Sequence, residues 1–301
     1  MRLSIGIVGN CHIAGISKAL WYYLSEPQVS IYHIVSVRST PPVKLLADLR
    51  KHDLIISIPF GDEIYPGGSD ALYAGLSTIQ MIPYLVFTAF HPDATYAVID
   101  AGAPGPVKVM SSPIGDNHSK LIYFGFKSGL TVEQTIRLFS KDVFSYLGYF
   151  DYWNESVSTA VELSDKIGYD IRRDLVEWTR YGCFMHTINH PKIYVIDSLT
   201  RRALQNAGLS MRPGRASELI ADDLQNSTVW PVYPAVAEQF GINGNYLFKT
   251  PDCDVIHDLP EFVAKSFSIY EQNRKLRFSN STVDPWLADP GKLAILHAMV
   301  K

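Results

Sequence analysis

The chain has 301 residues, of which 47% are hydrophobic and 19% charged, enough for one large globular domain or two smaller ones. Its net charge of −3 gives no electrostatic reason to expect a nucleic-acid partner. Apolar runs are too short for a membrane span or a signal peptide, so we expect a cytoplasmic protein. The widely spaced Cys11, Cys183 and Cys253 form no disulfide framework, and no spacing of His, Cys, Asp and Glu predicts a metal site.

The first part of the chain alternates between strand and helix patterns. Residues 3–8 are a short apolar run typical of a buried strand, and apolar residues then recur at helical spacing from Ile13 to Leu24. Alternation of this kind predicts a parallel sheet with helices on its faces. The further elements that we predict here are strands at 30–37, 53–60 and 84–90 and helices at 43–51 and 70–81.

Helical patterns dominate after about residue 118. Thr131 and Gln134 form a capping-box pattern at the start of one helix. The predicted helices are 119–127, one from 131, 156–166, 170–181, 193–207, 217–224, 260–276 and 290–301. We therefore expect an α/β fold, with a Rossmann-like or SGNH-like parallel sheet in residues 1–115. A mainly helical part, residues 116–301, completes the site or shares one core with the sheet.

A cysteine lies at the end of the first predicted strand. Gly9 and Asn10 suit a sharp turn and a helix N-cap, which would place Cys11 on the first turn of a helix. Backbone N–H groups and the helix dipole there would stabilise a thiolate, an anionic ligand or a developing oxyanion. We therefore expect an acidic, accessible thiol, against the alternative of a small packed residue. The neighbouring His12 either points into the same site or packs sideways.

Two further polar motifs follow predicted strands. His91-Pro92-Asp93 comes after the strand predicted at 84–90, so it should lie at the carboxyl edge of the sheet, where α/β folds bind ligands. His91 would be a general base within reach of the thiol, and Asp93 would orient its imidazole ring. Ser57 ends the third predicted strand and would add a hydroxyl to the same crevice. The remaining candidates are His118, Ser119, Asn189 and His190, which either face a ligand or cap helices.

The glycines around Cys11 do not form a known phosphate-binding loop. Gly6, Gly9 and Gly15 do not fit the dinucleotide fingerprint, and no Gly-Lys-Ser/Thr follows them. The strand, turn, nucleophile and helix resemble the first block of SGNH hydrolases. That likeness is limited to the turn, where Asn-Cys replaces Asp-Ser, and no distal Asp-x-x-His block is evident.

Four motifs in order resemble one particular family. They are Gly9-Asn10-Cys11, Phe90-His91-Pro92-Asp93, His118-Ser119 leading into residues 124–133, and residues 187–191 (Thr-Ile-Asn-His-Pro). This order is similar to that of the WcbI family of polysaccharide biosynthesis proteins, over about the first two thirds of the chain. Position 12, commonly Gln in that family, is His here, and the last third carries no motif that can be aligned.

The resemblance implies binding of coenzyme A and transfer of an acetyl group to a sugar hydroxyl of a capsular or other surface polysaccharide precursor. It implies acetyl-coenzyme A as donor, a saccharide as acceptor and polysaccharide biosynthesis enzymes as possible partners. Cys11 would carry the acetyl group, or His91 would deprotonate the sugar hydroxyl for direct attack on the thioester. The alternatives are a Cys-dependent esterase or deacetylase of SGNH-like type and a non-catalytic sugar- or nucleotide-binding subunit.

Overall fold

The computed structural model describes residues 2–100, 108–251 and 256–301, so Cys253 lies outside the described residues. The chain divides into two compact units. Unit 1 comprises residues 1–86, 157–185 and 189–225, and unit 2 comprises residues 87–156, 186–188 and 226–301. Each unit draws on chain segments from both sides of residue 115.

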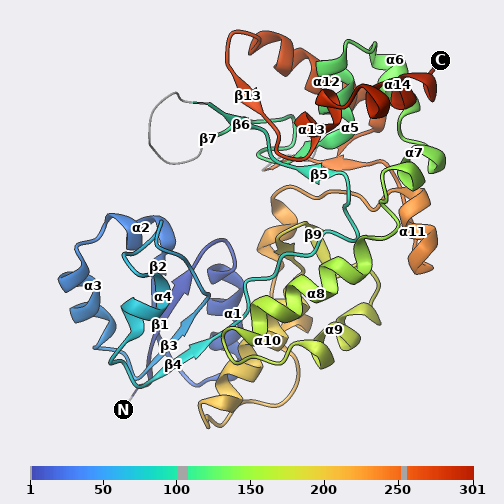
Figure 1. The fold of residues 1–301 in the computed structure, drawn as a ribbon. Coiled ribbons are helices and arrows are strands. Elements are labelled where there is room, and N and C mark those ends of the chain that lie inside the picture. The colour runs from blue at the N-terminus through green and yellow to red at the C-terminus, as the bar shows by residue number, and fades with distance from the viewer. Residues whose placement is uncertain (1, 101–107, 252–255) are drawn as a thin grey trace. The chain divides into compact units, whose positions relative to one another are not determined.

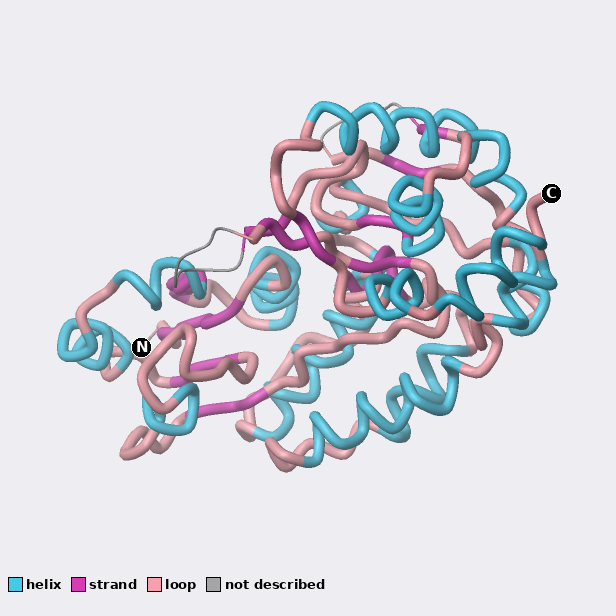
Figure 2. Tube along the Cα trace, turned by 45° about the horizontal axis from the view of Figure 1, so that its top comes forward, coloured by secondary structure: helices cyan, strands magenta, loops and turns pink. Residues whose placement is uncertain are grey.

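Unit 1 is built on a four-stranded parallel sheet with the order β2-β1-β3-β4 (Figure 1). Its strands are β1 (Ser4–Gly9), β2 (Gln28–His33), β3 (Leu54–Ser57) and β4 (Ile79–Met81), seen as neighbouring strands in Figure 2. The helices of this unit are α1 (Ile13–Tyr23), α2 (Ile34–Ser39), α3 (Pro42–Leu49), α4 (Gly68–Tyr73), α9 (Arg172–Thr179) and α10 (Ile193–Asn206). Helix α8 (Tyr152–Asp165) begins in unit 2 and continues into unit 1 from residue 157. Unit 1 also contains the short elements β10 (His190–Pro191), η1 (Ala216–Glu218) and η2 (Asp223–Asn226, whose last residue is in unit 2), while β9 (Met185–Thr187) lies mostly in unit 2.

Helices cover both faces of this sheet. Successive side chains of a strand point to opposite faces, so neighbouring residues of β1 pack in different core clusters. Ile5 and Ile7 of β1 pack in one core cluster with residues of α1 and α10. Val8 packs in a second cluster with residues of α2, α3 and α4. Two covered faces explain why strands β1 and β3 read as nearly continuous apolar runs.

Unit 2 combines short antiparallel strands with helices. Its helices are α5 (Lys120–Ser128), α6 (Val132–Arg137), α7 (Lys141–Tyr146), α11 (Pro234–Phe240), α12 (Leu259–Gln272), α13 (Val283–Ala288) and α14 (Pro290–Ala298). Its strands are β5 (Ala94–Thr95), β6 (Val98–Ile99), β7 (Lys108–Val109), β8 (His118–Ser119), β11 (Phe248–Lys249), β12 (Ile256–His257) and β13 (Phe278–Ser279). The predicted α/β class, with a parallel sheet and a helical C-terminal part, is confirmed. The capping box predicted at Thr131 is present at the start of α6.

Four predicted elements were wrong. The helix predicted at 70–81 ends at Tyr73 as α4, and residues 79–81 form strand β4 instead. Residues 84–90 form no strand, and the fourth strand of the sheet is β4, at 79–81. The second strand ends at His33, where the His33 side chain accepts a hydrogen bond from the Val35 N–H and starts α2. Residues 217–224 contain two short 3-10 helices in place of one helix. No helix of the described residues combines the length and apolarity needed to cross a membrane.

Candidate functional site

The carboxyl edge of the parallel sheet carries a cavity of about 320 Å³. Its lining begins with Asn10 after β1, Ile34 after β2 and Ile58 after β3, and Tyr84 follows β4. Strands β2 and β3 flank β1 on opposite sides, so the chain reverses its order at β1. Open α/β sheets bind ligands at such a switch point, outside the carboxyl ends of the strands. The remaining lining residues are Pro59, Phe60, Gly61, Glu63 and Ile64.

The turn between β1 and α1 holds Cys11 beside this cavity. The Asn10 side-chain oxygen accepts a hydrogen bond from the His12 N–H at 3.3 Å, and the Asn10 carbonyl accepts from the Ile13 N–H at 3.1 Å. The N-cap position is therefore His12, and Cys11 lies just before the helix instead of on its first turn. Gly9 is needed for space, because a Cβ atom there would lie 3.0 Å from the Ile13 side chain.

The environment of Cys11 opposes ionisation of its thiol. Burial against the apolar cluster that includes Ile13 and Tyr84 raises the pKa of Cys11 to about 11, although its backbone N–H acts in the opposite direction. Burial therefore acts against the acidic thiol that the turn predicts, and the acidity of Cys11 stays a prediction. The favourable turn is present, but removal of the thiolate from water costs more free energy than the turn recovers.

His12 points into the protein and anchors a second segment to the turn. Its Nε2 lies 3.2 Å from the Asn189 carbonyl oxygen, and its ring is 2% exposed. Burial is the main reason why the pKa of His12 is lowered to about 4. The nearby His190 also lowers this pKa, and the hydrogen bond to Asn189 acts in the opposite direction. The imidazole is therefore neutral at physiological pH. Its Nε2 carries the proton donated to Asn189, since a carbonyl can only accept.

Tyr84 and Asn189 complete this part of the site. The Asn189 side-chain N–H₂ donates to the Tyr84 hydroxyl at 3.2 Å, and the Tyr84 ring lies 5.8 Å from the His12 ring. Burial raises the pKa of Tyr84, so its hydroxyl stays neutral. Six of the predicted site residues belong to unit 1 and lie in this part of the structure: Gly9, Asn10, Cys11, His12, Asn189 and His190. The sequence does not predict Tyr84 as a site residue because its apolar neighbours resemble a strand. Its position shortly after β4 nevertheless places it at the carboxyl edge of the sheet.

Ser57 lies near this edge of the sheet but is fully buried. Its hydroxyl donates to the Ile58 carbonyl at 2.8 Å and bonds the Tyr73 hydroxyl at 2.6 Å. Because Ser57 is fully buried, a ligand could reach its hydroxyl only if the surrounding packing opened.

His91 and Asp93 belong to unit 2, so their predicted partnership with Cys11 joins residues of different units and stays a prediction. His91 is 1% exposed, and its N–H donates to the Thr88 carbonyl at 2.9 Å. The predicted pairing of Asp93 with the His91 imidazole stays a prediction. The Asp93 carboxylate accepts hydrogen bonds from the Leu121 N–H and the Tyr149 hydroxyl on one oxygen, and from the Tyr233 hydroxyl on the other.

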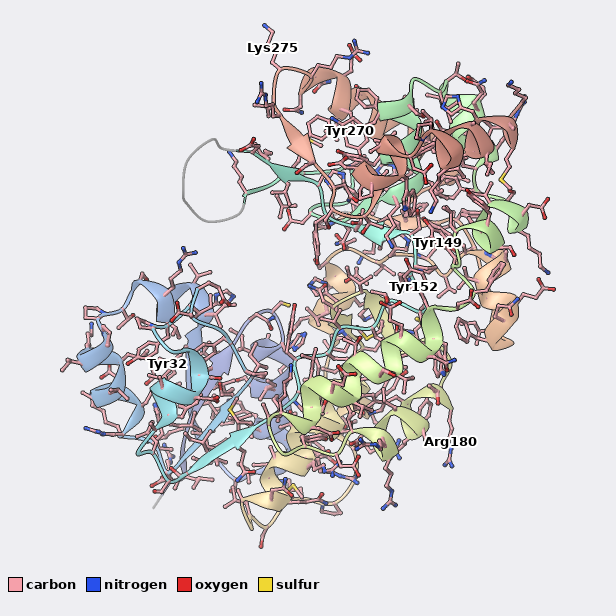
Figure 3. The ribbon with its side chains drawn as sticks, viewed as in Figure 1. Tyr32, Tyr149, Tyr152, Arg180, Tyr270 and Lys275 are labelled. Carbon is pink, nitrogen blue, oxygen red and sulfur yellow. The ribbon has the colours of Figure 1, made fainter. Side chains whose placement is uncertain are left out.

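A buried lysine holds the same turn from its other side. The Lys120 ammonium donates to the Pro92 carbonyl at 2.6 Å and to the Tyr152 hydroxyl at 3.0 Å. Tyr149 and Tyr152, which have adjacent labels in Figure 3, both present their rings to this ammonium. Burial raises the pKa of Asp93. No local sequence signal marks these tyrosines or Lys120 as partners of the turn.

His118 and Ser119 serve the interior of unit 2. The His118 ring bonds the Met110 carbonyl at 2.7 Å and the Tyr270 hydroxyl at 2.9 Å, and burial lowers its pKa. The Ser119 hydroxyl accepts from the Ile122 N–H and caps α5. Their roles as ligand-binding residues stay predictions. Within the described residues, no three His, Cys, Asp or Glu side chains gather to hold a metal ion.

Comparison with known proteins identifies the family. The family model described as "Polysaccharide biosynthesis enzyme WcbI" matches residues 4–212, which is more than half of the chain and includes every motif of the resemblance. No curated protein and no solved structure gives a significant match. The chain belongs to the WcbI family of polysaccharide biosynthesis enzymes.

Proposed function

We propose that this protein transfers an acetyl group from acetyl-coenzyme A to a sugar hydroxyl of a capsular or other surface polysaccharide precursor. The observation that carries the proposal is the cavity at the carboxyl edge of the parallel sheet, beside the Cys11 turn. Membership of a family of polysaccharide biosynthesis enzymes supports a saccharide as acceptor.

The cavity lining suits the acetyl-thioester end of the donor, and none of the described residues that line it is basic and could bind the phosphate groups of coenzyme A. Ile34, Ile58 and Phe60 provide apolar walls, and Asn10, Glu63 and Tyr84 provide the polar groups. Pockets with apolar walls and few polar groups are typical of small-molecule sites. An acetyl group and the thiol arm of coenzyme A offer matching apolar surface, and Asn10 offers hydrogen bonds that fix orientation.

The neutral state of Cys11 favours direct transfer over an acetyl-cysteine intermediate. In direct transfer, the sugar oxygen attacks the acetyl carbonyl carbon and the carbon–sulfur bond breaks. The hydroxyl proton passes to a base and then to the departing thiolate, giving an acetyl ester and coenzyme A. His12 is a weak base because its pKa is about 4, so His91 is the proposed base.

Calorimetric titration with coenzyme A and acetyl-coenzyme A tests the donor site. Ile34→Trp should fill the cavity and weaken binding at least tenfold. Val35→Trp is the matched control, because Val35 is the next residue, 67% exposed and outside the cavity lining. Equal binding by both variants would remove the cavity from the proposal. Absence of binding to the wild type would favour the hydrolase alternative.

Release of free thiol from acetyl-coenzyme A tests the chemistry. His91→Ala should bind the donor almost normally yet lose transfer by roughly 10²-fold or more. Cys11→Ser should retain transfer if attack is direct, and Cys183→Ser controls for the loss of a half-buried thiol. Full loss of transfer in Cys11→Ser, with donor binding intact, would replace direct transfer by the covalent route.

A further inference from the structure

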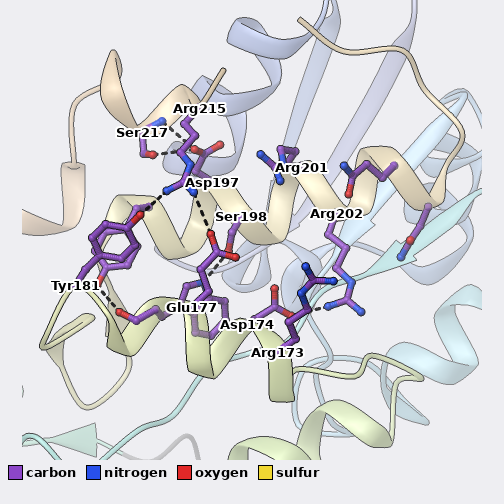
Figure 4. A pocket seen from close by; sticks show the side chains of 14 residues that line it. Arg173, Asp174, Glu177, Tyr181, Asp197, Ser198, Arg201, Arg202, Arg215 and Ser217 are labelled. Atoms are coloured by element: carbon purple, nitrogen blue, oxygen red, sulfur yellow. Dashed lines mark hydrogen bonds and ion pairs between the residues drawn. The ribbon is translucent and has the colours of Figure 1, made fainter. Parts of the chain in front are cut away.

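Unit 1 contains a second cavity, of about 370 Å³, between α9 and α10 (Figure 4). Tyr194, Ser198, Arg201 and Gln205 line it from α10 at spacings of three and four residues, so they share one face of that helix. The opposite face of α10 packs on α1, where Ile193 and Ile196 approach Gly15. This cavity, which we call the α9–α10 groove, is therefore distinct from the one beside Cys11.

Four arginines line the groove, and two of them are tied to carboxylates. Arg202 pairs with Asp174, and Arg215 pairs with Glu177 at 3.1 Å. The third carboxylate of the lining, Asp197, is buried and accepts hydrogen bonds from the Tyr23 and Ser217 hydroxyls and the Ser217 N–H. The acidic side chains of the lining are thus already engaged.

The other two arginines have no such partner. Within the part of the chain that the structure describes, Arg173 and Arg201 make no ion pair, and both are exposed at the groove. In Figure 4 the side chains of Arg173 and Arg202 extend toward each other from α9 and α10. Arg173 and Arg201 each present a guanidinium group to an anion that enters the groove. Their planar forks bind phosphate or carboxylate oxygens in pairs.

The rest of the groove offers the surface and the polar groups that a sugar ring needs. The Tyr181 and Tyr194 rings lie 5.2 Å apart, and the Tyr181 hydroxyl accepts a hydrogen bond from Arg215 at 2.7 Å. Ser198, Gln205 and Asn206 add hydroxyl and amide groups to the same lining. Aromatic faces pack against the apolar face of a sugar, and amides bind its hydroxyls.

We propose that the α9–α10 groove binds a phosphorylated saccharide, with Arg173 and Arg201 on the phosphate and the aromatic and amide groups on the sugar. Because the groove is separate from the donor cavity, it would hold a phosphate-bearing part of the precursor that is remote from the hydroxyl to be acetylated. This site does not depend on coenzyme A binding at the carboxyl edge of the sheet, so the two proposals fail separately.

Calorimetric titration with glucose 1-phosphate, glucose and inorganic phosphate tests the site. The wild type should bind glucose 1-phosphate at least tenfold more tightly than either other probe, and more weakly as salt is added. Arg201→Gln and Arg173→Gln should each lower that affinity about tenfold or more. Arg180→Gln is the matched control, because Arg180 is exposed just after α9 and does not line the groove (Figure 3).

Three outcomes would overturn the proposal. Wild-type affinity for glucose 1-phosphate in both Arg173→Gln and Arg201→Gln would remove the phosphate contact. Inorganic phosphate binding as tightly as glucose 1-phosphate would remove the saccharide. Loss of coenzyme A binding in Arg201→Gln would assign the groove to the donor, because the proposal expects donor binding to be unchanged there.

Discussion

Burial and backbone geometry act in opposite directions on Cys11. The turn after β1 supplies a backbone N–H that lowers the pKa of the thiol, while burial raises it and prevails, giving about 11. Burial therefore keeps the Cys11 thiol mainly protonated at neutral pH.

Alkylation with iodoacetamide measures this directly. In protein carrying Cys183→Ser and Cys253→Ser, only Cys11 can react. Its rate should keep rising as the pH increases beyond 9, because the thiolate population grows until the pH reaches a pKa of about 11. A rate that levels off below pH 8.5 would show that the turn outweighs burial, and would restore the covalent route.

For individual residues, the sequence motifs predict the position in the fold better than the hydrogen-bond partners. The Gly9–Cys11 turn is placed at the carboxyl edge of the sheet, as its local pattern indicates. Asp93 is predicted to orient His91, and its carboxylate also accepts hydrogen bonds from the Tyr149 and Tyr233 hydroxyls. Those tyrosines are distant in sequence and carry no spacing signal, so their bonds to Asp93 are visible only in three dimensions.

At the scale of elements, the wrong strand at 84–90 has a physical cause. Leu85, Phe87 and Phe90 are buried, so this segment has the same apolar pattern as a strand. Its hydrogen bonds differ: the Phe87 N–H donates to the Ile188 carbonyl, and the Thr88 N–H donates to the Ser156 hydroxyl. Apolar pattern reports burial, whereas a strand also needs a neighbouring strand in register.

The contact between α5 and α6 depends on Gly125, which lies in the segment 124–133 of the third family motif. A Cβ atom at Gly125 would clash with the side chain of Thr135, which is fully buried in α6. Gly125→Ala should therefore lower the free energy of unfolding by about 1–3 kcal/mol despite the higher helix propensity of Ala. Urea denaturation at fixed pH measures the change.

A double-mutant cycle separates this clash from a general effect on α5. Thr135→Ala removes the atoms that Gly125→Ala would meet but also the hydrogen bond from the Thr135 hydroxyl to the Thr131 carbonyl. The double variant should be more stable than the sum of the two single effects predicts, by about 1 kcal/mol. Strict additivity would mean that α5 and α6 do not meet at these residues.

At the scale of the whole molecule, each unit is assembled from separate segments of the chain. Unit 1 takes its sheet from residues 1–86 and one of its covering helices, α10, from residues 193–206. Ile196 and Leu204 of α10 are buried in the same cluster as Ile16 and Leu20 of α1. Element patterns in the sequence identify α10 as a helix, but they do not show which sheet it covers.

A fragment of residues 1–115 should consequently fail to fold, although it contains all four parallel strands. Without α10, burial of Ile196 and Leu204 is lost, about 3–6 kcal/mol of hydrophobic stabilisation. That loss is comparable with the whole stability of a typical domain. Circular dichroism on heating should show no cooperative transition, and the fragment should bind a dye specific for exposed apolar surface.

A longer fragment ending at Gln225 is the control, because it retains every segment of unit 1. It should regain a cooperative transition and slow hydrogen exchange in β1 and β3, the central strands of the sheet. Cooperative unfolding of the 1–115 fragment would instead show that α1 to α4 stabilise the sheet alone. In that case α10 would be an accessory helix, and residues 1–115 would form an independent domain.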